Sequence, residues 1–385
     1  MLELAVNGGR RYWAWLGFLG VVILSGAGFY SRQLDVGLAI TGLSRDVTWG
    51  FYVAQLTFLV GVAASAVMLV LPYYVHNFKV FGRITIIGEF LAAATISICL
   101  LFLFVDLGQP MRALNVFLYP TPHSIIFWDA TVLVGYLLLN IVIGWNVLEA
   151  ERNGVAAQAW LRPLIFLSIP WAFAIHTVTA FLYCGLPGRG LWLTAILAPR
   201  FLASAFASGP ALLILLCLFL RKAADFDAGR PAITALSKIV AYGLLANLFF
   251  LLCEIFVVFY SRIPAHMDHF IYLYAGMDGH GGLVAWMQAS LGLMVVAAVL
   301  LLIPATRNRY STLSAACVMV FVGTWIDKGM GLIAGGFIPS PLHEITEYAP
   351  TAPEIAISIG VYGIGGFLLT VLLKIAIGVK RETAA

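Results

Sequence analysis

Residues 84–105 read ITIIGEFLAAATISICLLFLFV, an apolar run in which Glu89 is the one charged side chain. A transmembrane helix needs about 20 consecutive apolar residues to cross the hydrocarbon core of a bilayer. The chain contains ten such runs, over residues 13–30, 49–75, 84–105, 124–148, 163–183, 201–220, 239–260, 282–303, 312–335 and 355–373. No alternating strand pattern competes with them, so we expect an all-α polytopic membrane protein with about ten transmembrane helices.

The composition excludes the soluble classes of protein. Of the 385 residues, 62% are apolar and 10% are charged, and the mean hydropathy is +0.98. Soluble domains have about 25% charged residues, so these few charges cannot cover a water-exposed surface. The net charge of +4 predicts no nucleic-acid partner, because the basic residues follow the connections between the runs.

The basic residues predict the orientation. Fifteen of the 22 Lys and Arg lie at the two termini or in the even-numbered connections, whereas six lie in the odd-numbered connections. Cytoplasmic loops carry the excess of Lys and Arg, so we expect both termini in the cytoplasm. The first run follows Arg10 and Arg11 and lacks a clean small-residue cleavage site, which favours a retained signal anchor over a cleaved signal peptide.

Ionisable residues inside the runs mark the candidate site, because a charge at the centre of a transmembrane helix costs about 2.5–3.5 kcal/mol. The outer half of the runs contains Asp129, His176, Glu254, Asp327 and Lys328, with Asp106 at an outer helix end and Glu89 alone in the inner half. Asp327 and Lys328 are adjacent, so their side chains project about 100° apart and each needs a partner on another helix. We expect an ion pair between Glu254 and Lys328.

This set of side chains fits a quinone better than a haem or a metal. A buried b-type haem commonly needs two histidines, and only His176 of the seven lies well inside a run. The five cysteines contain no CxxC pair for zinc or an iron–sulfur cluster. We therefore expect no haem, iron–sulfur cluster or metal in this chain.

A quinone needs an apolar slot open to lipid and one or two groups that hydrogen-bond its oxygens. Histidine suits this role because it exchanges protons near neutral pH. We expect His176 to hydrogen-bond the quinone. Asp129 and Asp106 would raise its basicity or relay its proton, and Arg112 would hold Asp106 ionised or position the loop. Four further groups are candidates for proton paths: Glu89, Glu254, Asp327 and Lys328.

Three outer connections combine glycine and proline with apolar and polar residues, at residues 187–192, 276–282 and 335–344. Ordinary turns between helices would explain them, but their length and apolar content favour a docking surface for a partner outside the membrane.

Short motifs follow one another along residues 45–375. They are 49–55 (WGFYVAQ) with 58–61 (FLVG), 106–110 (DLGQP) with Arg112, 122–124 (PHS) with 127–129 (FWD), 176–181 (HTVTAF), 191–192 (LW), 199–205 (PRFLASA), 336–339 (GFIP) and 348–354 (YAPTAPE). In this order they resemble the NrfD/polysulfide-reductase membrane-subunit family, in its ten-helix branch.

The resemblance implies an architecture and a setting. It implies two four-helix bundles, helices 2–5 and 6–9, with flanking helices, which divides the chain into residues 1–48, 49–200, 201–354 and 355–385. It also implies a prokaryotic cytoplasmic (inner) membrane. A ferredoxin-like, multi-cluster iron–sulfur subunit would dock on the outer face, and other redox subunits such as cytochromes would complete the complex.

The resemblance also implies a menaquinone or ubiquinone bound in the first bundle near the outer face. The family site uses a histidine or asparagine on the first bundle helix and a tyrosine on the fourth. The corresponding polar residues are Gln55 and His176, and Trp49, Arg112 and Tyr183 are further candidates for binding the quinone.

Two other functions remain open from the residues alone. A transporter or proton channel would also need intramembrane acids and lysine. A structural anchor would hold a redox assembly on the membrane, and it predicts that His176→Ala leaves quinol-dependent turnover intact.

Overall fold

The computed structural model describes residues 1–383, and these form ten long helices with no β-strand among them. Their bounds are α2 (Arg10–Val36), α3 (Phe51–Ala63) continued by η2 (Ala64–Ala66), α4 (Val67–Val70) and η3 (Leu71–Val75), α5 (Thr85–Asp106), α7 (Ile125–Arg152), α8 (Leu161–Cys184), α9 (Leu197–Ala223), α10 (Arg230–Ser261), α12 (Val284–Leu302), α14 (Tyr310–Trp325) continued by η6 (Ile326–Gly331) and α15 (Leu332–Phe337), and α16 (Ala352–Glu382). All ten are long and apolar enough to cross a membrane, which confirms the predicted class and number of spans.

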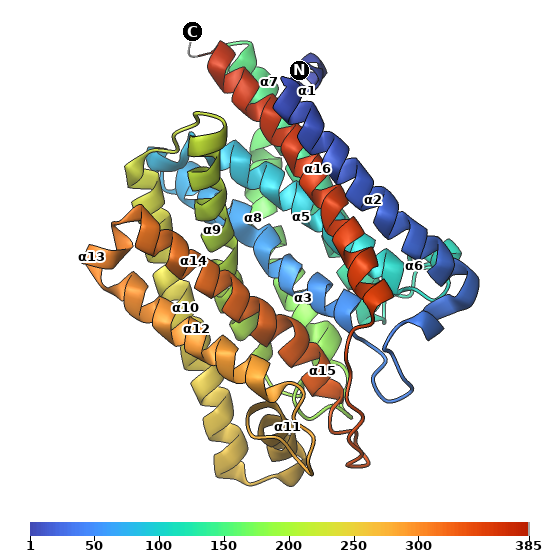
Figure 1. The fold of residues 1–385 in the computed structure, drawn as a ribbon. Helices are drawn as coiled ribbons and strands as arrows, with labels where there is room; N and C mark the ends of the chain where they lie inside the picture. Colours follow the sequence, from blue (N-terminus) through green and yellow to red (C-terminus); the bar gives the residue numbers. More distant parts are fainter. Residues whose placement is uncertain (384–385) are drawn as a thin grey trace.

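The helices pack mainly on their neighbours in the chain (Figure 1). α5 packs on α3 and α7, and α7 packs on α8; α9 packs on α10 and α14, and α12 packs on α14. α3 and α8 contact α9 and so join these two sets, whereas α2 lies along α16, which packs on α5. The predicted division at residues 48, 200 and 354 stays a prediction.

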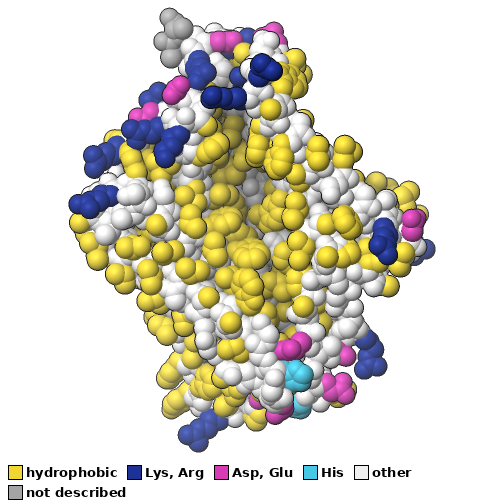
Figure 2. Space-filling model, viewed as in Figure 1, with side chains coloured by type: hydrophobic (Ala, Val, Ile, Leu, Met, Phe, Trp, Pro, Cys, Tyr) yellow, Lys and Arg dark blue, Asp and Glu magenta, His cyan; other side chains and the backbone are white. Residues whose placement is uncertain are grey.

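Both termini lie at one end of the molecule, which we call the terminal end (Figure 1). Arg152 at the end of α7 pairs with Glu3 at 2.6 Å and with Glu382 at 2.9 Å, and Lys380 pairs with Glu151 at 2.8 Å. Lys and Arg gather at this end, hydrophobic side chains cover the middle of the face in Figure 2, and the histidines visible there lie at the opposite end. The surface therefore has the banded character of a membrane protein.

The opposite end, which we call the loop end, contains the long connections between helices. It includes the short helix α11 (Pro264–Tyr274), which the hydropathy runs do not predict because its 11 residues are too few to span. Short helices also occur in two other connections, α6 (Asn115–Leu118) and α13 (Pro304–Arg307), and α1 (Leu2–Val6) precedes the first span.

The ninth span is interrupted by a π-helical turn, η6, that contains Asp327 and Lys328. Such turns occur often at functional sites because they re-aim side chains within a helix. A Cβ at Gly329 would lie 3.3 Å from the Ala54 carbonyl oxygen, and one at Gly331 would lie 2.4 Å from Met287 Sδ. These glycines let η6 approach α3 and α12 closely, and so place both charged side chains inside the protein.

Candidate functional site

Arg200 joins the buried acids of two other helices. It lies in the first turn of α9, and its Nη1 donates to Glu254 Oε2 of α10 at 2.5 Å. Its Nη2 donates to both carboxylate oxygens of Asp327 in η6, at 2.7 and 2.8 Å. Both acidic side chains are 4% exposed, so this arginine supplies the charge-assisted partners without which two buried carboxylates would be costly.

Lys328 has no such partner, and the predicted Glu254–Lys328 pair is wrong. Arg200 occupies the Glu254 carboxylate, and Lys328 Nζ makes no hydrogen bond to any residue within 1–383. The ammonium instead lies 4.1 Å from the centroid of the Phe201 ring, in a cation–π contact. A Cβ at Gly61 would lie 3.1 Å from Nζ, so the small residue on α3 makes room for this charge.

His176 lies on α8 and is fully buried, with 0% exposure. Its Nδ1 lies 2.9 Å from the Ala172 carbonyl oxygen, which makes Nδ1 the donor and leaves Nε2 as an acceptor. Nε2 has no hydrogen-bond partner among the described residues. His176 is therefore buried with one ring nitrogen, Nε2, that no described residue occupies.

Neither of the acids that we expected beside His176 forms a hydrogen bond with it among the described residues. Asp129 of α7 accepts a hydrogen bond of 2.6 Å from Thr179 Oγ1, one helical turn along α8 from His176. Asp106 ends α5, and its Oδ1 is buried without a partner within residues 1–383. Arg112 is exposed, and no ion pair joins it to Asp106 in the described part of the chain, so the predicted pairing is not formed.

Glu89 lies alone on α5, 3% exposed, and its Oε2 has no partner in the described chain. A Cβ at Gly144 of α7 would lie 3.3 Å from this oxygen. The carboxyl group is thus held against bare backbone in the half of the span toward the terminal end.

Trp49 and Tyr183, two predicted quinone ligands, lie together in an aromatic cluster with Trp192 and Phe337. The Trp49 ring centroid lies 5.8 Å from that of Tyr183 and 5.9 Å from that of Trp192. The Tyr183 hydroxyl is bonded to Thr57 Oγ1, and its ring is fully buried. This cluster fills the space between α3, α8 and the 185–196 connection.

Gln55, another predicted ligand, joins three helices. Its Oε1 accepts from Trp325 Nε1 of α14 at 2.8 Å and from the Tyr362 hydroxyl of α16 at 2.7 Å. Its Nε2 is a buried donor without a partner among residues 1–383.

Trp325 forms part of the wall of a cavity of about 440 Å³ at the loop end, which we call the slot. The starts of α3, α12 and α16 line it together with η6 and the 347–350 connection, and its aromatic lining residues are Phe51, Tyr272, Trp286, Trp325 and Tyr348. Trp286 is 55% exposed and Ile355 is 41% exposed on its rim. Both are apolar side chains in the first turns of α12 and α16, so the rim of the slot is open and apolar.

One carboxylate lines the slot. Glu347 Oε1 accepts from the Gly282 amide at 2.8 Å, and its Oε2 lies 3.7 Å from His280 Nδ1. The Glu347 and His280 side chains are 39% and 45% exposed, so a proton on either can exchange with water at the loop end.

The floor of the slot is fixed by Glu354. Its Oε1 accepts from the Tyr348 hydroxyl at 2.7 Å, and its Oε2 accepts from the amides of Gly42 and Thr351 at 2.7 and 2.8 Å. The Tyr348 hydroxyl accepts in turn from the Phe51 amide at 2.7 Å. Burial and the Glu354 carboxylate raise the pKa of Tyr348, so the hydroxyl stays protonated and donates to Glu354.

Sequence reasoning missed Arg200, Glu347 and Glu354 as site residues. Arg200 and Glu354 fall within the motifs 199–205 and 348–354, and the Thr351–Glu354 spacing is that of a capping box, which the structure contains. Glu347 has no signal of its own, because only the fold brings it to Gly282.

Comparisons with known proteins agree with this architecture. A family model described as polysulphide reductase, NrfD, matches residues 39–339. A protein of Halobacterium salinarum, provisionally named as a membrane subunit of dimethyl sulfoxide reductase, is 26% identical to this chain over 94% of it and 90% of the relative. The integral membrane subunit of a menaquinone reductase from Nitratidesulfovibrio vulgaris is 22% identical, over 94% and 90%.

A third relative matches about half of each chain. It is the integral membrane subunit of an Hdr-like menaquinol oxidoreductase from Archaeoglobus fulgidus, 28% identical over 51% of this chain and 49% of the relative.

Proposed function

The chain belongs to the NrfD polysulphide reductase family, and from that premise we propose that it is the quinone-interacting membrane subunit of a multisubunit redox complex. In this proposal it exchanges electrons between the membrane quinone pool and an iron–sulfur subunit on the outer face. Relatives that are named as membrane subunits of reductases, two of them with menaquinone or menaquinol in their names, support it.

The slot is the observation that carries the proposal. Its volume of about 440 Å³ lies within the range of about 300–1,000 Å³ typical of small-molecule sites. Its lining is largely aromatic and apolar, and in this proposal its mouth faces lipid while Glu347 lies at the end nearest the water. A flat head group on an isoprenoid tail has this distribution of polarity.

A quinol bound there would supply electrons together with protons. Glu347, which lines the slot, would accept a proton, and His280 beside it would pass the proton to water at the loop end. Trp325 and Gln55 would orient the head group, since Trp325 lines the slot and Gln55 holds its indole N–H. His176 and Asp129, fully buried behind them, would hold protons in the interior rather than touch the head group first.

The loop end offers a surface for the iron–sulfur subunit. Large apolar side chains stand exposed there on connections outside the spans, among them Met111 at 93%, Tyr119 at 74% and Leu342 at 75%. Exposed apolar groups on loops mark protein interfaces. A partner seated there would hold its cluster directly above the slot.

The metabolic role of the complex and the membrane that contains it are also proposals. The motif series most resembles DsrP, the quinone-interacting subunit of the Dsr membrane complex, with the subunits HybB and HmcC as alternatives. We therefore propose a role in sulfur-compound metabolism and anaerobic respiration, in a prokaryotic inner membrane with both termini in the cytoplasm. The gathering of Lys and Arg at the terminal end supports this orientation (Figure 2).

We also propose that the protein moves protons across the membrane. Glu89, His176 and Lys328 each have a buried polar atom without a partner among the described residues, and such groups mark proton relays in membrane proteins. We expect Glu89→Gln to abolish proton movement across vesicle membranes while quinol turnover continues. Unchanged proton movement in this variant would remove Glu89 from the path.

A blocked slot tests the function. Ala349 lines the slot and is exposed, so Ala349→Trp should close it, and quinol-dependent turnover of the assembled complex should fall at least tenfold. Ala352→Trp is the matched control, because Ala352 is exposed nearby but does not line the slot. Equal turnover in the two variants, with intact assembly, would favour a structural anchor.

A further inference from the structure

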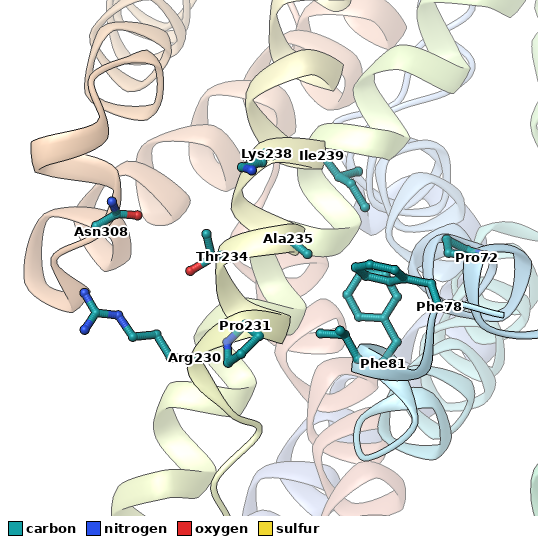
Figure 3. Close-up of a pocket in the computed structure, with 11 residues that line it drawn as sticks. Pro72, Phe78, Phe81, Arg230, Pro231, Thr234, Ala235, Lys238, Ile239 and Asn308 are labelled. Carbon is teal, nitrogen blue, oxygen red and sulfur yellow. The ribbon is translucent and has the colours of Figure 1, made fainter. Parts of the chain in front are cut away.

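We propose that a second cavity, at the terminal end, binds the phosphate head group and upper acyl chain of an anionic phospholipid. The cavity has a volume of about 690 Å³ and lies between the start of α10, the end of the second span with the connection that follows it, and the α13–α14 turn. We call it the basic hollow (Figure 3). It is independent of the slot, which lies at the opposite end.

Two parallel stripes of α10 form one wall of the basic hollow. Residues at i, i+4 and i+8 lie along one line of a helix, and here Arg230, Thr234 and Lys238 form a polar line. Pro231 and Ala235 begin an apolar line beside it, which Ile239 completes. A phosphodiester beside an acyl chain would meet both lines at once.

The opposite wall is apolar and aromatic. Phe78 and Phe81 belong to the connection after the second span, and their ring centroids lie 5.2 Å apart in an edge-to-face contact. Figure 3 shows these rings facing Ala235 and Ile239, whereas the Arg230 guanidinium lies on the side of Asn308. The apolar half of the hollow thus has two walls, and the charged half is open.

The two cations are free to bind an anion. Arg230 and Lys238 are exposed, and neither forms an ion pair with any acid in residues 1–383. The nearby Asp227 carboxylate accepts from the Gly229 amide at 3.0 Å, so it serves the turn before α10. Unpaired cations above an apolar cleft attract an amphiphile whose charge is negative.

The extent of the basic hollow along α10 favours a lipid over a free anion. Lys238 lies eight residues beyond Arg230, which is about 12 Å along the helix axis, and a lysine at that depth extends its ammonium toward the head-group layer. Basic pockets between spans on the cytoplasmic side bind anionic head groups. Free phosphate would satisfy the cations but leave the Phe78–Ile239 cleft without an occupant.

The test measures lipid binding by native mass spectrometry of the purified, delipidated complex. Micelles contain phosphatidylglycerol in one arm, phosphatidylcholine in the second, and phosphatidylglycerol with excess inorganic phosphate in the third. We expect phosphatidylglycerol to bind at least tenfold more tightly than phosphatidylcholine, and phosphate not to displace it. The double variant Arg230→Gln/Lys238→Gln should bind phosphatidylglycerol roughly 30-fold more weakly, since each basic residue near an anionic head group contributes about 1 kcal/mol.

Two further variants distinguish lipid binding in the basic hollow from a general effect of net charge. Lys222→Gln/Arg309→Gln removes the same charge from exposed residues of the terminal end that do not line the hollow, and it should bind lipid as the wild type does. Ala235→Trp should fill the apolar cleft and weaken binding with both cations present. Equal binding of the two lipids, displacement by phosphate, or equal losses in the two charge variants would each overturn the proposal.

Discussion

Two groups of buried ionisable side chains in the spans can be compared, and they differ in whether their polar atoms have partners. In the paired group, Arg200 neutralises Glu254 and Asp327 across three helices. In the unpaired group, Glu89, His176 and Lys328 each present an atom without a partner in the described chain.

We interpret the paired group as structural and the unpaired group as functional. A buried charge is tolerated when it is paired, and then breaking the pair is costly. A buried polar atom without a partner has no such structural use, and for an ionisable group inside a span our hypothesis is a functional one.

The largest expected effect comes from breaking the paired group. Arg200→Met would leave two buried carboxylates facing each other, so we expect the free energy of unfolding to fall by about 3–5 kcal/mol. Thermal denaturation of the purified protein in detergent measures this loss. Arg162→Met, at an exposed arginine, is the control, and equal melting of the two variants would show that the paired group does not hold the helices.

The next effect tests the unpaired group. His176→Ala removes a buried base, so we expect quinol-dependent turnover to fall on the order of 100-fold, as for loss of a proton-transferring group, while assembly persists. Thr177→Ala, whose hydroxyl bonds only the Phe173 carbonyl of its own helix, should retain turnover. If His176→Ala also retains turnover, the unpaired group has no role in the reaction.

A second buried histidine sharpens the comparison, because it is paired. His269 of α11 donates from Nδ1 to the Gly335 and Ile338 carbonyl oxygens, at 2.8 and 3.0 Å. Burial lowers its pKa below the usual 6.5, so the unfolded chain binds this proton more readily than the folded one. The stability that it contributes is therefore present above pH 6.5 and is lost as the pH falls below that value.

We expect His269→Ala to lower the free energy of unfolding by about 1–2 kcal/mol through its hydrogen bonds, without a change in turnover per assembled complex. Its melting temperature should also depend less on pH between 5 and 7, a range that brackets the usual histidine pKa of about 6.5. An unchanged pH dependence would mean that another group titrates there.

The smallest effect on stability concerns Lys328. Its ammonium has no carboxylate partner among residues 1–383, so Lys328→Met should leave the free energy of unfolding unchanged or raise it by about 1 kcal/mol. Chemical denaturation of this variant and of Arg200→Met measures the free energy of unfolding for one member of each group. A large loss of stability would place Lys328 in the paired group.

The spans could be predicted from the sequence because hydropathy is a local property. Each apolar run reports its own helix, although the helices continue past the runs into charged residues, as α7 does to Arg152 and α16 to Glu382. α11 was missed because its 11 residues are too few to form an apolar run of spanning length.

The site was predicted in its residue types but not in its contacts. The buried acids, His176, Gln55 and Tyr183 were all identified, since an ionisable or polar residue in an apolar run is visible locally. Their partners were not, because Arg200 reaches Glu254 and Asp327 from 54 and 127 residues away. The slot is likewise a tertiary feature, assembled from five separate segments.

The account rests on a redox carrier that enters the slot from lipid. Photolabelling of the assembled complex with an azido-quinone, followed by peptide mapping, tests this directly. We predict labels on slot residues such as Trp286 and Met330, and their loss in Ala349→Trp but not in Ala352→Trp. Labelling confined to other helices, and unaffected by closing the slot, would contradict the account.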